Sequence, residues 1–251
     1  NGRGTVALNV AVVGYVSTTG NGGSLIPVRR DSLKGANPLS VTRDAKVVSI
    51  AGRAGVPNGA RAVVLNVRRF ADAQLTTLWA WPDGGAKPAP SSWRRGSKGA
   101  TAQRIIVPLG ASGDIRIAGD RPGKVALDVV GYVAADDTRK LHPIVPNTVT
   151  RSGLRVGGDH AVNISVRGRV GIPSNARAVL VELTGINASR NARLTIWPRG
   201  GVRPNPADLF VPKHRDRDGF AVVPIGDKGD IRVHVGAGKA GVRVALLGWL
   251  S

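Results

Sequence analysis

The segment VVGYV at residues 12–16 returns as VVGYV at 129–133 and as LLGWL at 246–250. The glycines of the three copies, Gly14, Gly131 and Gly248, are spaced 117 residues apart. A period of this length indicates repeated units, each long enough to bury a core of its own. The sequence therefore predicts similar domains at 18–136 and 137–251, with residues 1–17 as an extra copy of the strand that ends each repeat.

Two long blocks of sequence also recur, at an offset of 116 residues. GVPNGARAVVLNV (55–67) matches GIPSNARAVLVEL (171–183), and TLWAWPDGGAKPAP (77–90) matches RLTIWPRGGVRPNP (193–206). Apolar residues alternate with other residues in short runs, and Gly, Pro, Asn and Asp separate the runs. Such alternation is typical of antiparallel strands, and no stretch has helical periodicity. We therefore predict an all-β fold of two tandem antiparallel β-sandwiches or barrels.

Comparison of the repeats predicts which side of one strand faces the core. Four residues are apolar at matching positions and are expected in the two cores: Leu78 and Ala80 in the first repeat, Leu194 and Ile196 in the second. Neighbouring residues on a strand point to opposite sides of the sheet. Trp79, Trp81, Thr195 and Trp197 are therefore expected on the outer side.

The order of these motifs, closed by VALDVVGYV at 125–133, resembles a β repeat of secreted actinobacterial surface and cell-wall-associated proteins. The resemblance extends from about Leu25 to Leu250. It implies a non-catalytic module that is secreted and associated with the cell surface, and it implies no established ligand. The Asp of the closing motif is present as Asp128, but Ala11 and Ala245 replace it in the other two copies, so no role tied to that Asp is carried over to them.

The charge of the chain points to an anionic partner. It has 36 Lys and Arg against 16 acidic residues, a formal net charge of +20. Such an excess of one sign is costly by self-repulsion, and a polyanion offsets it. We expect an anionic cell-wall polymer or polysaccharide; the alternative is a generally basic surface without a dedicated ligand. The basic residues form no recognisable nucleic-acid motif, so we expect no specific nucleic-acid partner, and no apolar run is long enough to predict a membrane span.

Motifs for catalysis, metals and cofactors are weak. The chain has no Cys, no G-x-S-x-G and no H-E-x-x-H. GAGKAG (236–241) fits a dinucleotide fingerprint but lies between two strand patterns, so we interpret it as a hairpin turn. HRDRD (214–218) is interpreted as a solvated loop, and Asp114 and Asp230 as turn residues that cap their own backbone. We therefore expect a protein that is not an enzyme, with no metal and no cofactor.

The tryptophans are the candidate ligand-binding residues. Flat aromatic faces can stack on a sugar ring, and nearby arginines can bind phosphate or carboxylate groups. The candidates are Trp79, Trp81, Trp197, Arg94, Arg95 and Arg199. The favoured alternative is that each Trp packs beneath the Gly- and Pro-rich loop that follows it.

The extra N-terminal strand has three possible roles. An unpaired apolar strand favours aggregation, so it is expected to be covered. It could pack against the first repeat, add to a neighbouring subunit's sheet in a head-to-tail homo-oligomer, or be the remnant of an upstream repeat. The candidate assembly residues are Val6, Leu8, Val10, Val12 and Tyr15.

Three functional hypotheses follow. The leading one is a secreted, cell-surface-associated module held to anionic envelope polymer by its basic surface. The alternatives are a self-assembling subunit of an extracellular filament or array that donates its N-terminal strand, and a lectin-like carbohydrate-binding module.

Overall fold

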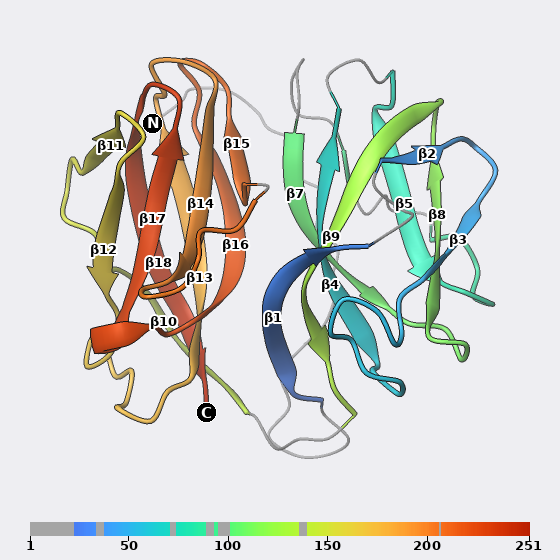
Figure 1. Cartoon of the computed structure of the whole chain (residues 1–251), viewed down its shortest axis with the longest axis horizontal. Coiled ribbons are helices and arrows are strands. Elements are labelled where there is room, and N and C mark those ends of the chain that lie inside the picture. Colours follow the sequence, from blue (N-terminus) through green and yellow to red (C-terminus); the bar gives the residue numbers. More distant parts are fainter. Residues whose placement is uncertain are drawn as a thin grey trace.

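The fold was analysed in a computed structural model that describes residues 23–33, 38–70, 74–88, 93–94, 101–135, 140–205 and 207–251. These residues form strands, with one short 3-10 turn, η1 (Asp227–Gly229), and no α-helix in the same ranges. All pairs of neighbouring strands are antiparallel. The predicted all-β fold is confirmed (Figure 1). No helix among these residues has the length and apolar character needed to cross a membrane.

The strands at residues 25–133 form two sheets, which we call A and B. Sheet A has the order β1 (Leu25–Ser32), β9 (Gly123–Val133), β4 (Ala62–Arg69) and β7 (Thr101–Pro108), with β2 (Leu39–Val41) also paired to β9. Sheet B has the order β3 (Lys46–Ser49), β8 (Asp114–Gly119), β5 (Thr77–Pro82) and β6 (Trp93–Arg94).

The strands at residues 141–250 repeat this arrangement in sheets C and D. Sheet C has the order β10 (Leu141–Thr148), β18 (Lys239–Leu250), β13 (Ala178–Ile186) and β16 (Arg217–Pro224), with β11 (Arg155–Gly157) paired to β18. Sheet D has the order β12 (Ala161–Ser165), β17 (Asp230–Gly236), β14 (Ala192–Pro198) and β15 (Leu209–Val211). We call residues 23–135 the first unit and residues 140–251 the second unit.

The two units match in register as well as in strand order. The pairing of β1 with β9 shifts between Pro27 and Asp31, and that of β10 with β18 shifts at the matching positions, Pro143 and Asn147. A second matching shift lies between Val64 and Leu65 in β4 and between Leu180 and Val181 in β13. Each of these second shifts leaves one residue of the closing strand unmatched, next to its Gly. The recurrent Gly-Tyr and Gly-Trp pairs therefore mark a bulge.

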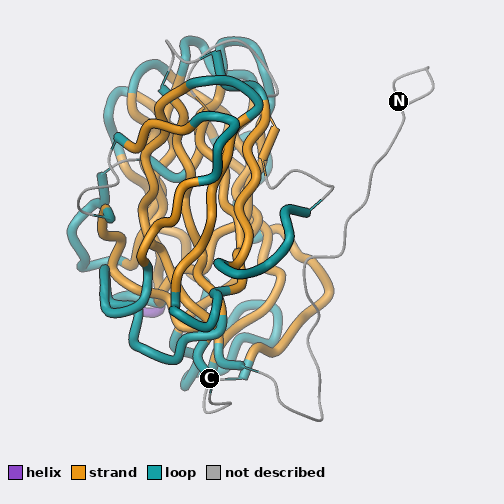
Figure 2. Tube along the Cα trace, turned by 90° about the vertical axis from the view of Figure 1, so that its right-hand side faces the viewer, coloured by secondary structure: helices purple, strands orange, loops and turns teal. Residues whose placement is uncertain are grey.

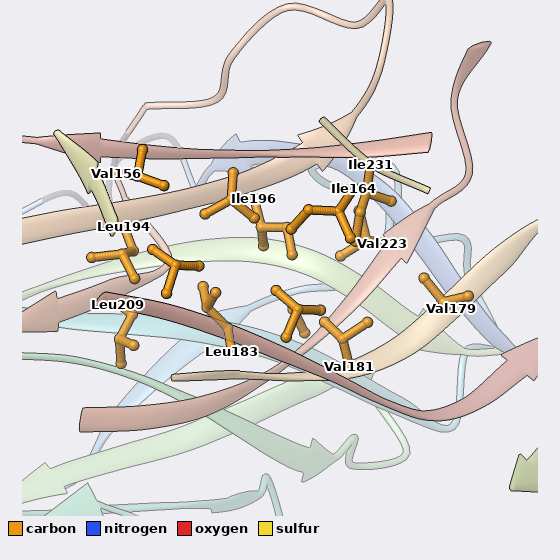
Figure 3. Close-up of a cluster of buried hydrophobic side chains, with 14 of the residues drawn as sticks. Val156, Ile164, Val179, Val181, Leu183, Leu194, Ile196, Leu209, Val223 and Ile231 are labelled. Carbon is orange, nitrogen blue, oxygen red and sulfur yellow. The ribbon is translucent and has the colours of Figure 1, made fainter. Parts of the chain in front are cut away.

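Each unit has its own aliphatic core between its two sheets. The residues predicted to face inward, Leu78 and Ala80 in β5 and Leu194 and Ile196 in β14, are buried in the two core clusters. Figure 3 shows the core of the second unit, where side chains from several strands meet between the sheets. In Figure 2 the strands run in a similar direction and loops gather at their ends. This is the arrangement of a β-sandwich.

One turn differs from its prediction. GAGKAG was interpreted as a hairpin turn, but β17 belongs to sheet D and β18 to sheet C. The turn therefore carries the chain from one sheet of the sandwich to the other, and the hairpin prediction is wrong. Alternation of residue types predicts strands on either side of a turn but does not distinguish a hairpin from a crossing between facing sheets.

The two units are joined by a buried ion pair. Arg104 in β7 donates to the carboxylate of Asp208, just before β15, and its Nη1 donates to the carbonyl oxygen of Phe220 in β16 at 2.6 Å. Asn66 in β4 adds a hydrogen bond from Nδ2 to the carbonyl oxygen of Ala207 at 3.2 Å. The outer side of sheet A therefore faces the second unit.

The predicted extra strand at residues 1–17 lies outside the described residues, as do Val6, Leu8, Val10, Val12 and Tyr15. Its role and the proposed domain boundaries stay predictions.

The matched core positions provide a test of the two-sandwich architecture. Leu78→Ala and Leu194→Ala each remove a fully buried side chain at equivalent places. We expect each substitution to lower the free energy of unfolding by about 2–5 kcal/mol, measured by urea denaturation. Val145→Ala, at an exposed position, is the control and should change stability by less than about 0.5 kcal/mol. If the free energy of unfolding falls at both leucines by as little as in the control, the assigned cores are contradicted.

Candidate functional site

The outer sides of sheets B and D carry the tryptophans singled out in the sequence. Trp81 in β5 pairs with Arg116 in β8, and Trp197 in β14 pairs with Arg232 in β17. Residues directly opposite each other in antiparallel strands share one side of the sheet. Each unit thus has a Trp–Arg pair on its outer side, and we call these two surfaces the Trp faces.

The tryptophan rings are covered, although they lie on the predicted side of the sheet. Trp81 and Trp197 are only 6% and 4% exposed. Nε1 of Trp197 donates to the carbonyl oxygen of Gly201 at 3.1 Å, so the loop after β14 folds back over the ring. This confirms for Trp197 the alternative in which the Trp packs beneath the following loop. Neither ring presents an open stacking surface.

Basic side chains lie over the rings of Trp79 and Trp197. The Lys87 ammonium lies 3.9 Å from the centre of the Trp79 ring, and the Arg232 guanidinium lies 5.6 Å from the centre of the Trp197 ring. Cations at these distances are attracted to the electron-rich ring faces. On the Trp faces, the aromatic rings thus hold basic side chains in place.

In the second unit, Arg199 is held by a buried carboxylate. Its Nη1 donates to Oδ2 of Asp230 at 2.6 Å, and the Ser165 hydroxyl donates to Oδ1 of the same residue at 2.8 Å. The Asp230 side chain is 7% exposed, whereas that of Arg199 is 31% exposed. Asp230 therefore links strands β12 and β17 with the loop after β14, and the prediction that it caps its own backbone is wrong.

These contacts control the ionisation of Asp230. Burial raises the pKa of the carboxyl, but hydrogen bonds from Arg199 and Ser165 and the positive charges of Arg199 and Lys228 lower it by more. The net effect is a pKa below the ordinary value of 3.8. Asp230 is therefore charged at neutral pH and fixes the guanidinium.

A second basic group is held near the other end of β17. Nε2 of His234 lies 2.5 Å from Oδ1 of Asp159 and 2.6 Å from Nη1 of Arg203, which itself lies 3.5 Å from the same carboxylate. Nε2 either donates to Asp159 or accepts from Arg203, depending on the tautomer. The hydrogen bond from His234, its charge and that of Arg203 lower the pKa of Asp159.

The first unit builds its Trp face differently. Nε of Arg116 donates to Oδ1 of Asp83 at 2.6 Å. Asp83 occupies the position of Arg199 and contacts Arg116, the equivalent of Arg232, whereas Arg199 contacts Asp230. Ala118 occupies the position of His234, so the His is absent. The two Trp faces share a backbone and a Trp–Arg pair, but not their charge pattern.

The predicted ligand residues lie on two separate surfaces. Trp79 and Trp81 belong to sheet B, whereas Trp197 belongs to sheet D and Arg199 to the loop after β14. Sheets B and D lie in different halves of the molecule in Figure 1. Arg94 lies in β6 opposite Thr77, but its side chain is not described, and Arg95 lies outside the described residues. Ligand binding by this set stays a prediction.

Several residues at these sites were not found from the sequence. Asp159, Arg203 and His234 come from three segments, and none of them was a candidate site residue. The repeat alignment gave one signal: His234 aligns with Ala118, and Arg203 with Lys87. In the HRDRD segment, the Asp216 side chain accepts a hydrogen bond from the backbone amide of Asn187 at 2.9 Å. Among the described residues, no three His, Asp or Glu side chains gather in a way that could hold a metal ion.

Comparisons with known proteins add little. No family model matches the chain, and no curated protein is similar to it. One similar solved structure is the N-terminal CBM22-1-CBM22-2 tandem domain of Xyn10C from Paenibacillus barcinonensis. It is 7% identical, with 92% of this chain and 100% of the other covered, at a TM-score of 0.24. A TM-score this low supports no transfer of function.

The covered tryptophan predicts a structural cost. We expect Trp197→Ala to lower the free energy of unfolding by about 3–5 kcal/mol, because it leaves a cavity and frees the Gly201 carbonyl. Chemical denaturation provides the measurement. Val202→Ala, at an exposed position in the same loop, should change stability by less than about 0.5 kcal/mol. A loss as small as that of the control would show that the ring is not packed.

The lowered pKa of Asp230 predicts a dependence of stability on pH. A carboxyl whose pKa is lower in the folded state contributes stability above its unfolded pKa, near 3.8, and loses it as the pH falls through the folded pKa. Asp230→Asn should therefore be less stable than the parent at pH 7, with a smaller difference at about pH 2.5. Urea unfolding at both pH values tests this, with the exposed Asp227→Asn as control. A difference that does not depend on pH would contradict the assignment.

Proposed function

We propose that this chain is a non-enzymatic, secreted module that attaches to an anionic polymer of the cell surface through arginines on the Trp face of the second unit. The observation that carries the proposal is the anchoring of Arg199 by Asp230 and of Arg203 by Asp159 on one outer surface. Both belong to a chain with a net charge of +20.

The anchored arginines keep hydrogen-bonding capacity for a ligand. Their side chains are 31% and 48% exposed. A guanidinium has five N–H donors, so one contact with a carboxylate leaves others for a phosphate, sulfate or carboxylate group. An arginine already fixed in one orientation also loses less conformational entropy on binding.

A third arginine on this surface, Arg232, strengthens the argument. Arg232 is held over Trp197, between Asp230 and His234 along β17. Arg199, Arg232 and Arg203 thus follow β17 and its flanking loop as a row of cations. A row of this kind suits a polymer that carries an anionic group on each repeating unit.

The two alternative functions have less structural support. The filament hypothesis depends on residues 6–16, outside the described part of the chain, and stays a prediction. Stacking of sugars on Trp81 or Trp197 is disfavoured because both rings are covered. The secreted and wall-associated setting rests on the resemblance of the repeats and is part of the proposal.

Polyglycerol phosphate, compared with uncharged dextran, tests the proposal. We expect the protein to bind the phosphate polymer and not the dextran, with an affinity that falls at least about tenfold between about 50 and 500 mM NaCl, because the contacts are ionic. Arg199→Gln/Arg203→Gln should weaken binding by about tenfold or more and reduce the salt dependence.

The control removes the same number of charges elsewhere. Arg151 and Arg215 are exposed and lie outside the Trp faces, so Arg151→Gln/Arg215→Gln should cost much less affinity. Thermal unfolding of each variant establishes that it is folded. If both double variants lose the same affinity for polyglycerol phosphate, binding depends on the overall basic charge and the assigned face is rejected. Binding that does not respond to salt would reject the proposal itself.

A further inference from the structure

A cleft of about 520 Å³ lies between the two units. Strand β7 of the first unit forms one wall, and strands β13, β16 and β18 of sheet C, with the start of β15, form the rest. The lining residues that matter here are Arg104, Glu182, Asp208, Asp218, Phe220 and Leu247. Its size is within the range of small-ligand sites, which often lie between domains.

The walls of the cleft are fixed by buried contacts. The Arg104 and Asp208 side chains are 6% and 2% exposed, and Arg104 also donates to the Phe220 carbonyl oxygen. The second oxygen of Asp208 accepts a hydrogen bond from the Ile196 amide at 2.8 Å. A site whose walls are held in this way needs little rearrangement to bind a ligand.

The floor of the cleft combines an aromatic ring with carboxylates. Glu182, the only glutamate in the chain, lies directly opposite Phe220 in the pairing of β13 with β16. Asp218 lies two residues before Phe220, on the same side of the sheet, and Leu247 lies nearby in β18. An aromatic ring packs against the C–H face of a sugar, and carboxylates accept hydrogen bonds from its hydroxyl groups.

The fold does not require these side chains. At the same places in the first unit, Asn66 lies opposite Arg104 in the pairing of β4 with β7, and Ala102 replaces Asp218. Both units have the same strand order. The aromatic and acidic residues are therefore particular to the second unit, where they face the cleft.

The charge of the cleft excludes the polyanion as its natural occupant. Asp208 is neutralised by Arg104, which leaves Glu182 and Asp218 against Arg217. In a chain with 36 basic and 16 acidic residues, this is a locally acidic place. A neutral ligand rich in hydroxyl groups matches it better than a phosphate or sulfate.

We propose that the cleft binds one or two uncharged sugar residues of a polysaccharide. The sugar ring packs against Phe220 and Leu247, while Glu182 and Asp218 accept hydrogen bonds from its hydroxyl groups. This site is separate from the Trp face of the second unit, and the proposal does not rest on the binding of anionic polymer.

Titration calorimetry with uncharged oligosaccharides of glucose, xylose, mannose, galactose and N-acetylglucosamine tests the site. We expect at least one to bind with a Kd below about 1 mM that changes less than about twofold between about 50 and 500 mM NaCl, because the contacts are not between ions. Glu182→Ala should weaken binding at least about tenfold, and Glu182→Gln should weaken it less, because an amide keeps one acceptor.

A variant in the other unit tests the location of the site. Ala102→Trp places a bulky ring in the cleft without altering the second unit, and it should abolish sugar binding. Arg199→Gln/Arg203→Gln should leave it unchanged, and thermal unfolding should show that all variants are folded. No binding by any oligosaccharide, or binding unaffected by both Ala102→Trp and Glu182→Ala, would overturn this inference. If the parent protein binds an oligosaccharide but does not bind polyglycerol phosphate, only the function proposed above is overturned.

Discussion

The closing strand of each repeat holds its unit together. β9 pairs with β1, β4 and β2, and β18 pairs with β10, β13 and β11. Its inward residues contribute to the core, and the residue before its Gly, Val130 or Leu247, forms the bulge shared by both units. The VVGYV segment at 129–133 and the LLGWL segment at 246–250 thus belong to the central strands of sheets A and C. Three strands of each sheet depend on the closing strand for backbone hydrogen bonds: β1, β2 and β4 in sheet A, and β10, β11 and β13 in sheet C.

Local alternation was enough to predict the fold, but not the site. The burial of Leu78 and Leu194 followed from apolar positions that recur in both copies. The cover over Trp197 did not, because strand periodicity gives the side of the sheet but not the path of the next loop. The contacts of His234 with Asp159 and of Arg104 with Asp208 join segments 75 and 104 residues apart. Contacts between residues so far apart in the chain cannot be predicted from the local pattern of one sequence.

Duplication of a sandwich leaves its outer surfaces free to diverge. The cores use aliphatic residues at equivalent positions, since a β-sandwich is stable only if both inner faces are filled. Outside the core, Arg199 replaces Asp83, His234 replaces Ala118 and Glu182 replaces Asn66. The candidate binding residues are found among these differences, whereas the matching residues maintain the architecture.

The ion pair between Arg104 and Asp208 has a consequence for the geometry of attachment. It is buried and is accompanied by the hydrogen bonds of Arg104 to Phe220 and of Asn66 to Ala207, so separating the units would break several polar contacts at once. Sheets B and D therefore keep fixed places in one body, with sheet B at the right and sheet D in the left-hand unit (Figure 1). With the units held together in this way, a polymer bound to the Trp face of the second unit would lie at a fixed distance from the outer side of sheet B.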